Sequence, residues 1–164
     1  MSHPSALTIS NISKHYQDGG RQIEVLRDLS LSVAAGESLS VTGPSGSGKS
    51  TLLNLLAGLL ELDNGDITLQ LKDATFSYRA ASERARTALR RQHIGYVFQF
   101  FNLVPTLTVL ENVRLPARLN RRPELEAQAE ALLRDFGLSD RFHDFPEALS
   151  GGEQQRVAVA RAVL

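Results

Sequence analysis

Apolar and polar residues alternate through the first third of the chain, with the two-residue period of a half-buried strand. The pattern predicts strands at 7–9 (LTI), 29–33 (LSLSV), 37–41 (ESLSV) and 66–71 (DITLQL). Between the first strand and the next, QDGG at 17–20 predicts a hairpin turn, because an Asp-Gly pair tolerates positive φ angles. The N-terminal third is therefore expected to be mostly sheet.

The period changes after Gly48, where helices take over. Leucines are so dense over 52–60 that they cannot share one amphipathic face, which predicts a helix buried on most sides. The same analysis predicts a short strand in IGYVF, 94–98. Further helices are predicted in AASERARTALRRQ (80–92), LTVLENVRLPARL (107–119), ELEAQAEALLRDFG (124–137, with Gly137 just past its end) and GGEQQRVAVARAVL (151–164).

Composition narrows the function classes. Hydrophobic residues make up 42% and charged residues 22% of the 164, which argues against disorder. The 18 Lys and Arg balance the 18 Asp and Glu, so no electrostatic footprint for bulk nucleic acid is present. Cysteine is absent, which excludes disulfides and thiolate chemistry. No run approaches the roughly 20 apolar residues of a membrane span, and we expect any membrane link to come through a partner.

The stretch GPSGSGKST at 43–51 fits the phosphate-loop pattern G-x-x-x-x-G-K-[ST]. Its glycines let backbone N–H groups turn inward around phosphate oxygens, and Lys49 reaches the outer phosphates. Ser50 offers a hydroxyl to Mg²⁺, and Thr51 to an inner phosphate. Because the loop follows a predicted strand and opens a helix, a merely flexible turn is disfavoured. The loop alone does not separate kinases, GTPases, helicases and pumps.

A second glycine-rich helix start lies at 148–156, ALSGGEQQR. Ser150 and Glu153 have the spacing of a capping box, a common structural feature. Bare N–H groups of Gly151 and Gly152 at the positive end of a helix would also attract an anion. Taken alone, the motif leaves both interpretations open.

Together the two motifs resemble the ATP-binding subunits of ABC transporters, whose signature is Leu-Ser-Gly-Gly-Gln. Here it reads Leu149-Ser150-Gly151-Gly152-Glu153. Glu153 departs from the commonest form and fits the subgroup for lipoprotein release and macrolide-type export. The resemblance implies an α/β P-loop NTPase fold with an antiparallel β subdomain and a helical subdomain. It implies an ATP-binding core over 1–98 and a helical signature subdomain over 99–164.

The resemblance also implies roles for single residues. Tyr16 would stack on adenine, and Gln99 would touch Mg²⁺ and the attacking water. Lys49 and Gln99 are thus the expected catalytic residues, and Ser50 and Gln99 the metal-binding ones. The residues expected to contact ATP are Tyr16, Gly43, Pro44, Ser45, Gly46, Ser47, Gly48, Lys49, Ser50, Thr51 and Gln99. In the family a second subunit packs head to tail, and its Ser150, Gly151, Gly152 and Glu153 would contact the same ATP.

The partners implied are that second ATPase subunit and a transmembrane permease subunit, contacted through part of 99–112. A peripheral position on the cytoplasmic face of the membrane follows, with Mg²⁺ and ATP as ligands and export or extraction as the task. An arginine-rich stretch over 79–91 leaves a nucleic-acid role open, although a solvated face is the simpler interpretation. Alternatives are a non-transport ABC ATPase acting on ribosomes or DNA, and a truncated module that binds ATP without hydrolysis.

Family members continue past the signature helix to a strand ending in Asp-Glu and to a histidine loop. Neither pattern occurs here, and all four histidines precede the signature. We therefore expect an N-terminal fragment that lacks the C-terminal part of the core sheet. Alone, it should be poorly stable and hydrolyse ATP negligibly.

Overall fold

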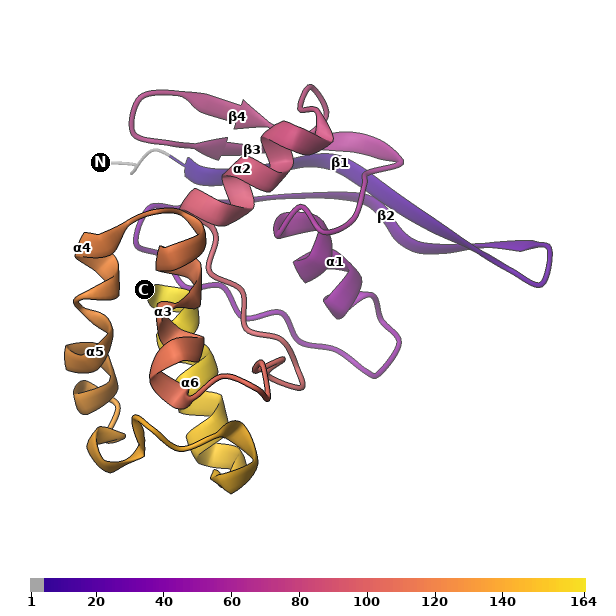
Figure 1. Ribbon diagram of the computed structural model, residues 1–164. Coiled ribbons are helices and arrows are strands. Elements are labelled where there is room, and N and C mark those ends of the chain that lie inside the picture. The colour runs from indigo at the N-terminus through magenta and orange to yellow at the C-terminus, as the bar shows by residue number, and fades with distance from the viewer. Residues whose placement is uncertain (1–4) are drawn as a thin grey trace. The chain divides into compact units, whose positions relative to one another are not determined.

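The strands of the N-terminal half form one antiparallel sheet in the computed structural model, which describes residues 5–164. The strand order is β2-β1-β3-β4, and Figure 1 shows β1 and β2 as a long hairpin. The bounds are β1 (Ser5–Asp18), β2 (Arg21–Ala34), β3 (Asn64–Gln70) and β4 (Thr75–Ser77). Of the five predicted strands, 7–9 and 29–33 lie within β1 and β2, and 66–71 overlaps β3 and runs one residue past its end.

The hairpin turn predicted at 17–20 is confirmed. Asp18 pairs with Arg21, and the two residues between them, Gly19 and Gly20, have φ angles of 54° and 81°. Both angles are positive, as a two-residue turn that follows the twist of its strands requires. The turn therefore sets the register of the hairpin from Asp18–Arg21 to His15–Glu24, beyond which the pairing shifts.

The predicted strands at 37–41 and 94–98 are wrong, because both segments are irregular. A strand needs a hydrogen-bonded neighbour, and neither segment pairs with any of the four strands in the described part of the chain. Alternating sequence alone therefore does not make a strand where no partner edge is available.

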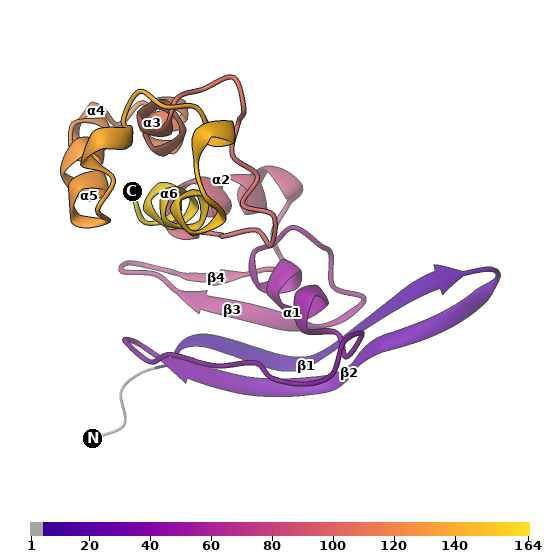
Figure 2. The same ribbon diagram turned by 90° about the horizontal axis from the view of Figure 1, so that it is seen from below.

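The chain forms two compact units, one up to Ala88 and one over Leu89–Leu164. In the first unit, α1 (Lys49–Leu56) lies on one face of the sheet, as Figure 2 shows. Its Leu52 and Leu55 are buried, and the hydroxyl of Tyr78 donates to the carbonyl of Leu56 at 2.5 Å. These contacts attach the helix that follows the phosphate loop to the sheet.

The expected burial of the leucine-rich helix on most sides is only partly met. Leu53 is 46% exposed, and the helix ends at Leu56, so that Leu59 and Leu60 lie beyond it. An eight-residue helix on a sheet buries one stripe, and the sequence density of leucine does not extend that stripe around the helix.

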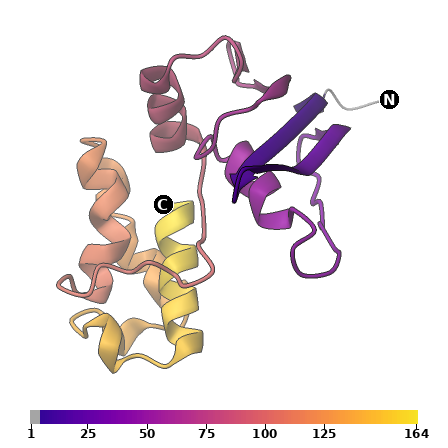
Figure 3. The same ribbon diagram turned by 90° about the vertical axis from the view of Figure 1, so that its right-hand side faces the viewer.

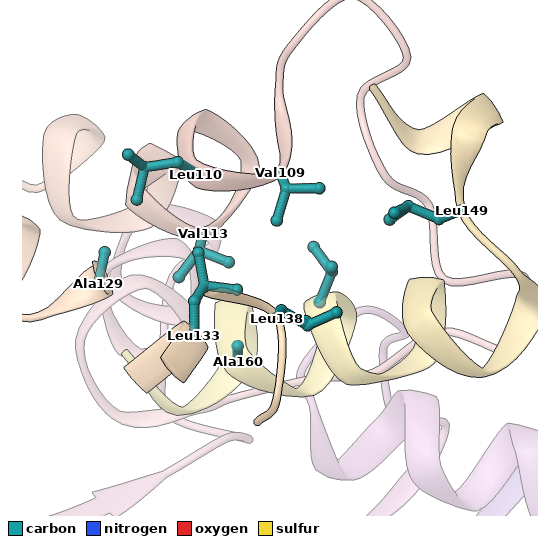
Figure 4. Close-up of a cluster of buried hydrophobic side chains, with 9 residues drawn as sticks. Val109, Leu110, Val113, Ala129, Leu133, Leu138, Leu149 and Ala160 are labelled. Carbon is teal, nitrogen blue, oxygen red and sulfur yellow. The ribbon is translucent and has the colours of Figure 1, made fainter. Parts of the chain in front are cut away.

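The second unit is helical. Its elements are α3 (Val109–Leu119), α4 (Pro123–Glu126), α5 (Ala129–Asp135), two short 3₁₀ helices (Ser139–Arg141 and Pro146–Ala148) and α6 (Gly151–Val163). The helix α2 (Glu83–His93) spans the division between the units. Figure 4 shows the core, in which buried side chains of α3, α5 and α6 meet. Its members are Val109, Leu110, Val113, Ala129, Leu133, Leu138, Leu149, Val157 and Ala160.

The single helix predicted over 124–137 is two helices, α4 and α5, separated at Ala127 and Gln128. The predicted end is confirmed, since Gly137 follows the cap residue Phe136 and has a φ angle of 69°. A left-handed glycine in that place stops the helix.

Among residues 5–164, no helix combines the length and the apolar character needed to cross a bilayer.

Candidate functional site

The phosphate loop has the backbone that its glycines predict. Gly43, Gly46 and Gly48 have φ angles of 150°, 81° and 86°, a region that L side chains rarely adopt. At Gly48 space is also limiting, because a Cβ would lie 3.0 Å from both Cγ1 and the carbonyl oxygen of Val25 in β2. The loop is therefore shaped by glycine backbone and is packed at one end against the hairpin.

The N-terminus of α1 is open to an anion. Gly48 is its N-cap, no side chain caps the helix, and its first turn carries no acidic residue. The first N–H groups of a helix have no partner within it, and they form its positive end. Electrostatically, this end of α1 suits a phosphate.

The ammonium group of Lys49 lies across the loop. Its Nζ donates to the carbonyl oxygens of Gly43 at 2.9 Å and Pro44 at 2.7 Å. The hydroxyl oxygen of Ser47 is 3.5 Å away. An ammonium group has three donors, and the loop's own oxygens occupy them in the place where phosphate oxygens would compete. The remaining polar loop residues, Ser45 and Ser50, are exposed, and Thr51 is half-buried.

Tyr16 lies on β1 in the same unit as the loop and is 39% exposed. It pairs with Ile23 of β2, two residues from the Val25 that contacts Gly48. The nitrogen Nζ of Lys14 is 5.8 Å from the centroid of the Tyr16 ring. The pairing of β1 with β2 thus places the exposed Tyr16 ring on the part of the hairpin against which the loop packs.

Asp63 anchors the strand segment beside Tyr16. Its carboxylate accepts from Nζ of Lys14 at 2.7 Å and from the backbone N–H of His15 at 2.6 Å. Partial burial acts to raise the pKa of Asp63, but these hydrogen bonds outweigh it, and the pKa lies below the ordinary value. The carboxylate stays charged and holds the strand at neutral pH.

Gln99 lies in the second unit, exposed on a turn that follows the 94–98 segment. Two residues later Phe101 and Asn102 have φ angles of 61° and 48°, an unusual conformation for residues other than glycine. Their carbonyl oxygens accept from Arg161, and Figure 3 shows this segment running beside α6. The predicted glutamine is thus carried by a strained turn that α6 holds.

The second glycine-rich helix start is capped by its own residues, unlike α1. Ser150 is the N-cap of α6, and its hydroxyl accepts from the N–H of Glu153 at 3.3 Å. The Glu153 carboxylate accepts from the N–H of Ser150 at 2.8 Å and from its hydroxyl at 2.6 Å. The hydrogen bond from the Ser150 hydroxyl, with that from its backbone, lowers the pKa of Glu153. The capping box predicted from the spacing is confirmed.

No contact among the described residues requires glycine at positions 151 and 152. A Cβ on Gly151 would meet no atom within 4 Å, and one on Gly152 would be 3.9 Å from the Arg156 guanidinium. Neither glycine is one of the described residues that have a positive φ angle. Both positions have room for a Cβ, so packing among the described residues does not select glycine there.

Sequence reasoning missed three residues of this region. Arg161 donates to the turn after Gln99, and Arg141 donates to the Glu153 carboxylate. Asn112 is fully buried. Each lies in a helix or loop where its residue type is ordinary, so no spacing distinguishes it. No group of three potential metal-binding His, Cys, Asp or Glu side chains occurs among residues 5–164.

The comparisons with known proteins agree with this geometry. The family model for "ABC transporter" matches residues 26–164, which is most of the chain. The chain belongs to the ABC transporter family. An ABC transporter ATP-binding protein of Mycobacterium tuberculosis (strain CDC 1551 / Oshkosh) is 44% identical over 99% of this chain and 65% of its own length. The lipoprotein-releasing system ATP-binding protein LolD of Hydrogenovibrio crunogenus is 45% identical, over 96% of this chain and 68% of its own.

Among solved ABC transporter structures, the chain is similar to MJ0796, described as a bacterial ABC transporter cassette in a dimeric structure. The TM-score is 0.85 at 39% identity, over 96% of this chain and 68% of that one. A second dimeric structure of MJ0796, bound to ADP and Pi, gives a TM-score of 0.84 at the same identity. The α/β P-loop NTPase fold expected from the motifs is confirmed. The chain spans about two thirds of the length of these relatives.

Proposed function

We propose that this chain is the nucleotide-binding part of the ATP-binding subunit of an ABC transporter. In the whole protein, hydrolysis of Mg-ATP drives export or extraction of a substrate through a transmembrane partner. The family membership and the LolD-type relatives support this assignment. The observation that carries it is the glycine-shaped loop at the uncapped N-terminus of α1, with Lys49 lying across it.

The residues of the loop suit a nucleoside triphosphate. Phosphate oxygens would replace the carbonyl oxygens of Gly43 and Pro44 as partners of the Lys49 ammonium. The open N–H groups at the start of α1 would bind the inner phosphates, and Ser45, Ser47 and Thr51 would add hydroxyl donors. Lys49 would then neutralise charge that develops on the outer phosphate.

Tyr16, Ser50 and Gln99 complete the proposed ligand set. The exposed Tyr16 ring would stack on adenine near the loop. A Mg²⁺ ion, which neutralises phosphate charge when bound, would be held by the exposed Ser50 hydroxyl and the Gln99 amide oxygen. Both donors are oxygens, as Mg²⁺ requires. The proposed boundaries of the nucleotide core and the signature subdomain remain 1–98 and 99–164.

The start of α6 is proposed to bind the outer phosphate of an ATP held by a second copy. Among residues 5–164, no contact requires glycine at positions 151 and 152, so the open space there is available to a ligand supplied from outside. Their N–H groups and the Ser150 hydroxyl lie at the positive end of a 13-residue helix. The similarity to MJ0796, which forms a dimer, supports the head-to-tail arrangement.

Residues 99–112 are the proposed contact with the transmembrane partner, on the cytoplasmic face of the membrane. Phe100 is 81% exposed at the tip of the turn that follows Gln99. In the proposed complex, the transmembrane partner would cover this exposed apolar side chain. Nucleotide-dependent movement of Gln99 would thus reach the partner through the adjacent residue.

The deciding experiment measures binding of a fluorescent ATP analogue by the full-length protein. Lys49→Ala should weaken binding at least tenfold, an order of magnitude typical of losing a charged hydrogen-bond partner. Lys72→Ala is the matched control, since Lys72 is an exposed lysine outside the loop. Equal affinity of the two variants for the analogue would contradict the assignment.

A further inference from the structure

We propose that Arg141 is a positioning residue for the phosphate-binding end of α6. It holds and partly neutralises the Glu153 carboxylate, so that an anion can approach Ser150, Gly151 and Gly152. This inference rests on the proposed function, since the charge that Arg141 neutralises lies at the site where the ATP of a second copy would bind.

The two oxygens of the Glu153 carboxylate have different partners. Oε2 accepts both hydrogen bonds from Ser150, from the backbone at 2.8 Å and from the hydroxyl at 2.6 Å. Oε1 accepts from Nε of Arg141 at 3.2 Å. The same guanidinium donates through Nη1 to Asp144 at 3.0 Å. Arg141 thus fixes the carboxylate from the side away from the serine.

The electrostatic problem comes from the glutamate itself. The commonest residue at the fifth signature position is a neutral glutamine, whereas Glu153 places a negative charge within hydrogen-bond distance of the serine that would bind phosphate. Like charges repel, and the repulsion is strongest where water is excluded, as in an interface between two subunits. Arg141 leaves the cluster with Asp144 and Glu153 one net negative charge instead of two.

A comparison within the chain separates this role from capping. The capping box of α3 has the same geometry: Glu111 accepts from the N–H of Thr108 at 2.9 Å and from its hydroxyl at 3.0 Å. The Thr108 hydroxyl accepts from the Glu111 N–H at 3.3 Å, as at α6. In the described part of the chain, Glu111 forms no direct ion pair, although Arg118 helps to lower its pKa from a longer distance. The α3 box thus forms without an arginine in direct contact, so the contact of Arg141 with Glu153 is not needed to make the cap.

The test measures nucleotide-driven self-association of the full-length protein by sedimentation, with Mg²⁺ and a non-hydrolysable ATP analogue. Arg141→Gln should lower the association constant roughly tenfold, because the glutamate charge then faces the phosphate. Binding of the analogue by the monomer should not change, because the phosphate loop is untouched. Arg122→Gln is the matched control, since it removes another Arg–Glu pair (3.0 Å, Nε to Oε1) on the surface.

Rescue distinguishes positioning from support of the fold. Glu153→Gln keeps the cap without the charge, and the double variant with Arg141→Gln should associate within about twofold of Glu153→Gln alone. Arg141→Lys keeps the charge and should lie between wild type and Arg141→Gln. Circular dichroism shows whether Arg141→Gln is folded. If it is not, the association constants of Arg141→Lys, Glu153→Gln and their double variant are compared instead.

The outcomes are separable from those of the proposed function. If the wild-type protein associates and Arg141→Gln has the same association constant, the role of Arg141 is overturned and the proposed function stands. A double variant whose association constant stays as low as that of Arg141→Gln would also overturn it. A wild-type protein that neither binds the analogue nor associates would overturn the proposed function, and this inference with it. A loss that shrinks at high salt supports the electrostatic account.

Discussion

Arg161, near the C-terminal end of α6, donates from Nη2 to the carbonyl oxygen of Phe101 at 2.6 Å. Its Nη1 donates to the next carbonyl, that of Asn102, at 2.7 Å. Burial lowers the pKa of Arg161 from its ordinary value, yet the group has no carboxylate within ion-pair distance among residues 5–164. One helix thus carries the signature serine at its start and the turn after Gln99 near its end.

Arg161→Gln is expected to loosen this turn. Hydrogen bonds to charged groups contribute about 1.5–3 kcal/mol each, and a glutamine amide can reach only one of the two carbonyls. Hydrogen exchange of the 99–104 amides in the full-length protein should therefore accelerate roughly tenfold. Arg161→Lys should behave in the same way, because an ammonium group lacks the planar fork. Exchange rates unchanged in both variants would show that the turn is held by other contacts.

Asn102 tests the strain in the same turn. Its φ angle of 48° costs roughly 1 kcal/mol for a residue with a Cβ, somewhat less for asparagine. Asn102→Ala should accelerate local exchange several-fold, whereas Asn102→Gly should leave it unchanged or slow it. Because the side chain is exposed, both variants lose the same contacts and differ mainly in backbone preference. Identical exchange in the alanine and glycine variants would contradict this account.

Local signals gave the parts of the site that depend on glycine and on capping spacing. The positive φ angles of Gly43, Gly46 and Gly48 follow from the phosphate-loop pattern, because few other residues adopt them. The capping box at Ser150 likewise follows from a spacing of three residues. These features need only neighbours in sequence, so the chain predicts them well.

Features that depend on distant partners were not predictable. The segment 37–41 alternates like a strand and 94–98 is largely apolar, but neither pairs with a strand in the described part of the chain. The contact between Arg161 and Phe101 joins residues 60 positions apart, and no periodicity signals it. Arg141 contacts Glu153 from twelve residues away, and no spacing rule predicts that pair.

Gly95 should be intolerant of any side chain. A Cβ built on it would overlap the carbonyl oxygen of Ala162 in α6, which is backbone and cannot rotate away. Gly95→Ala should therefore separate the 94–98 segment from α6 and lower the midpoint of thermal unfolding by several degrees. Gly151→Ala is the matched control, because its Cβ meets open space. Equal midpoints for the two variants would contradict the close approach.

Asn112 connects α3 to the loop that precedes it. Its buried amide oxygen accepts from the N–H of Val104 at 2.7 Å, and its Nδ2 shares two hydrogens among the carbonyls of Val104, Leu107 and Thr108, each at 3.0 Å. Asn112→Ala should lower the free energy of unfolding by about 3 kcal/mol, since the N–H of Val104 and the carbonyl of Leu107 lose the buried amide that pairs them. Asn120→Ala, which removes one bond to the Arg91 carbonyl, should cost much less in chemical denaturation. Similar losses in both variants would argue that the loop is held elsewhere.

The two capping boxes predict how the helical unit responds to acid. Hydrogen bonds from Thr108 lower the pKa of Glu111, and those from Ser150 lower the pKa of Glu153. A carboxylate whose pKa is lower when folded stabilises the fold above its unfolded pKa of about 4.3, and that contribution is lost as the pH falls through the folded value. Amide exchange at the starts of α3 and α6 should therefore increase relative to the core as the pH falls below about 4.

The glutamine variants provide the control for this acid response. Glu111→Gln and Glu153→Gln retain an oxygen that accepts the capping hydrogen bonds but does not titrate. Combined in one protein, they should remove the extra acid sensitivity of the two helix starts while leaving the response of other carboxylates, such as Asp63, in place. The comparison is made by hydrogen exchange at pH 7 and at about pH 3.5, after correction for the intrinsic exchange rate. If the wild-type and doubly substituted proteins lose protection equally at the two helix starts, the charged caps are not the source of the acid response.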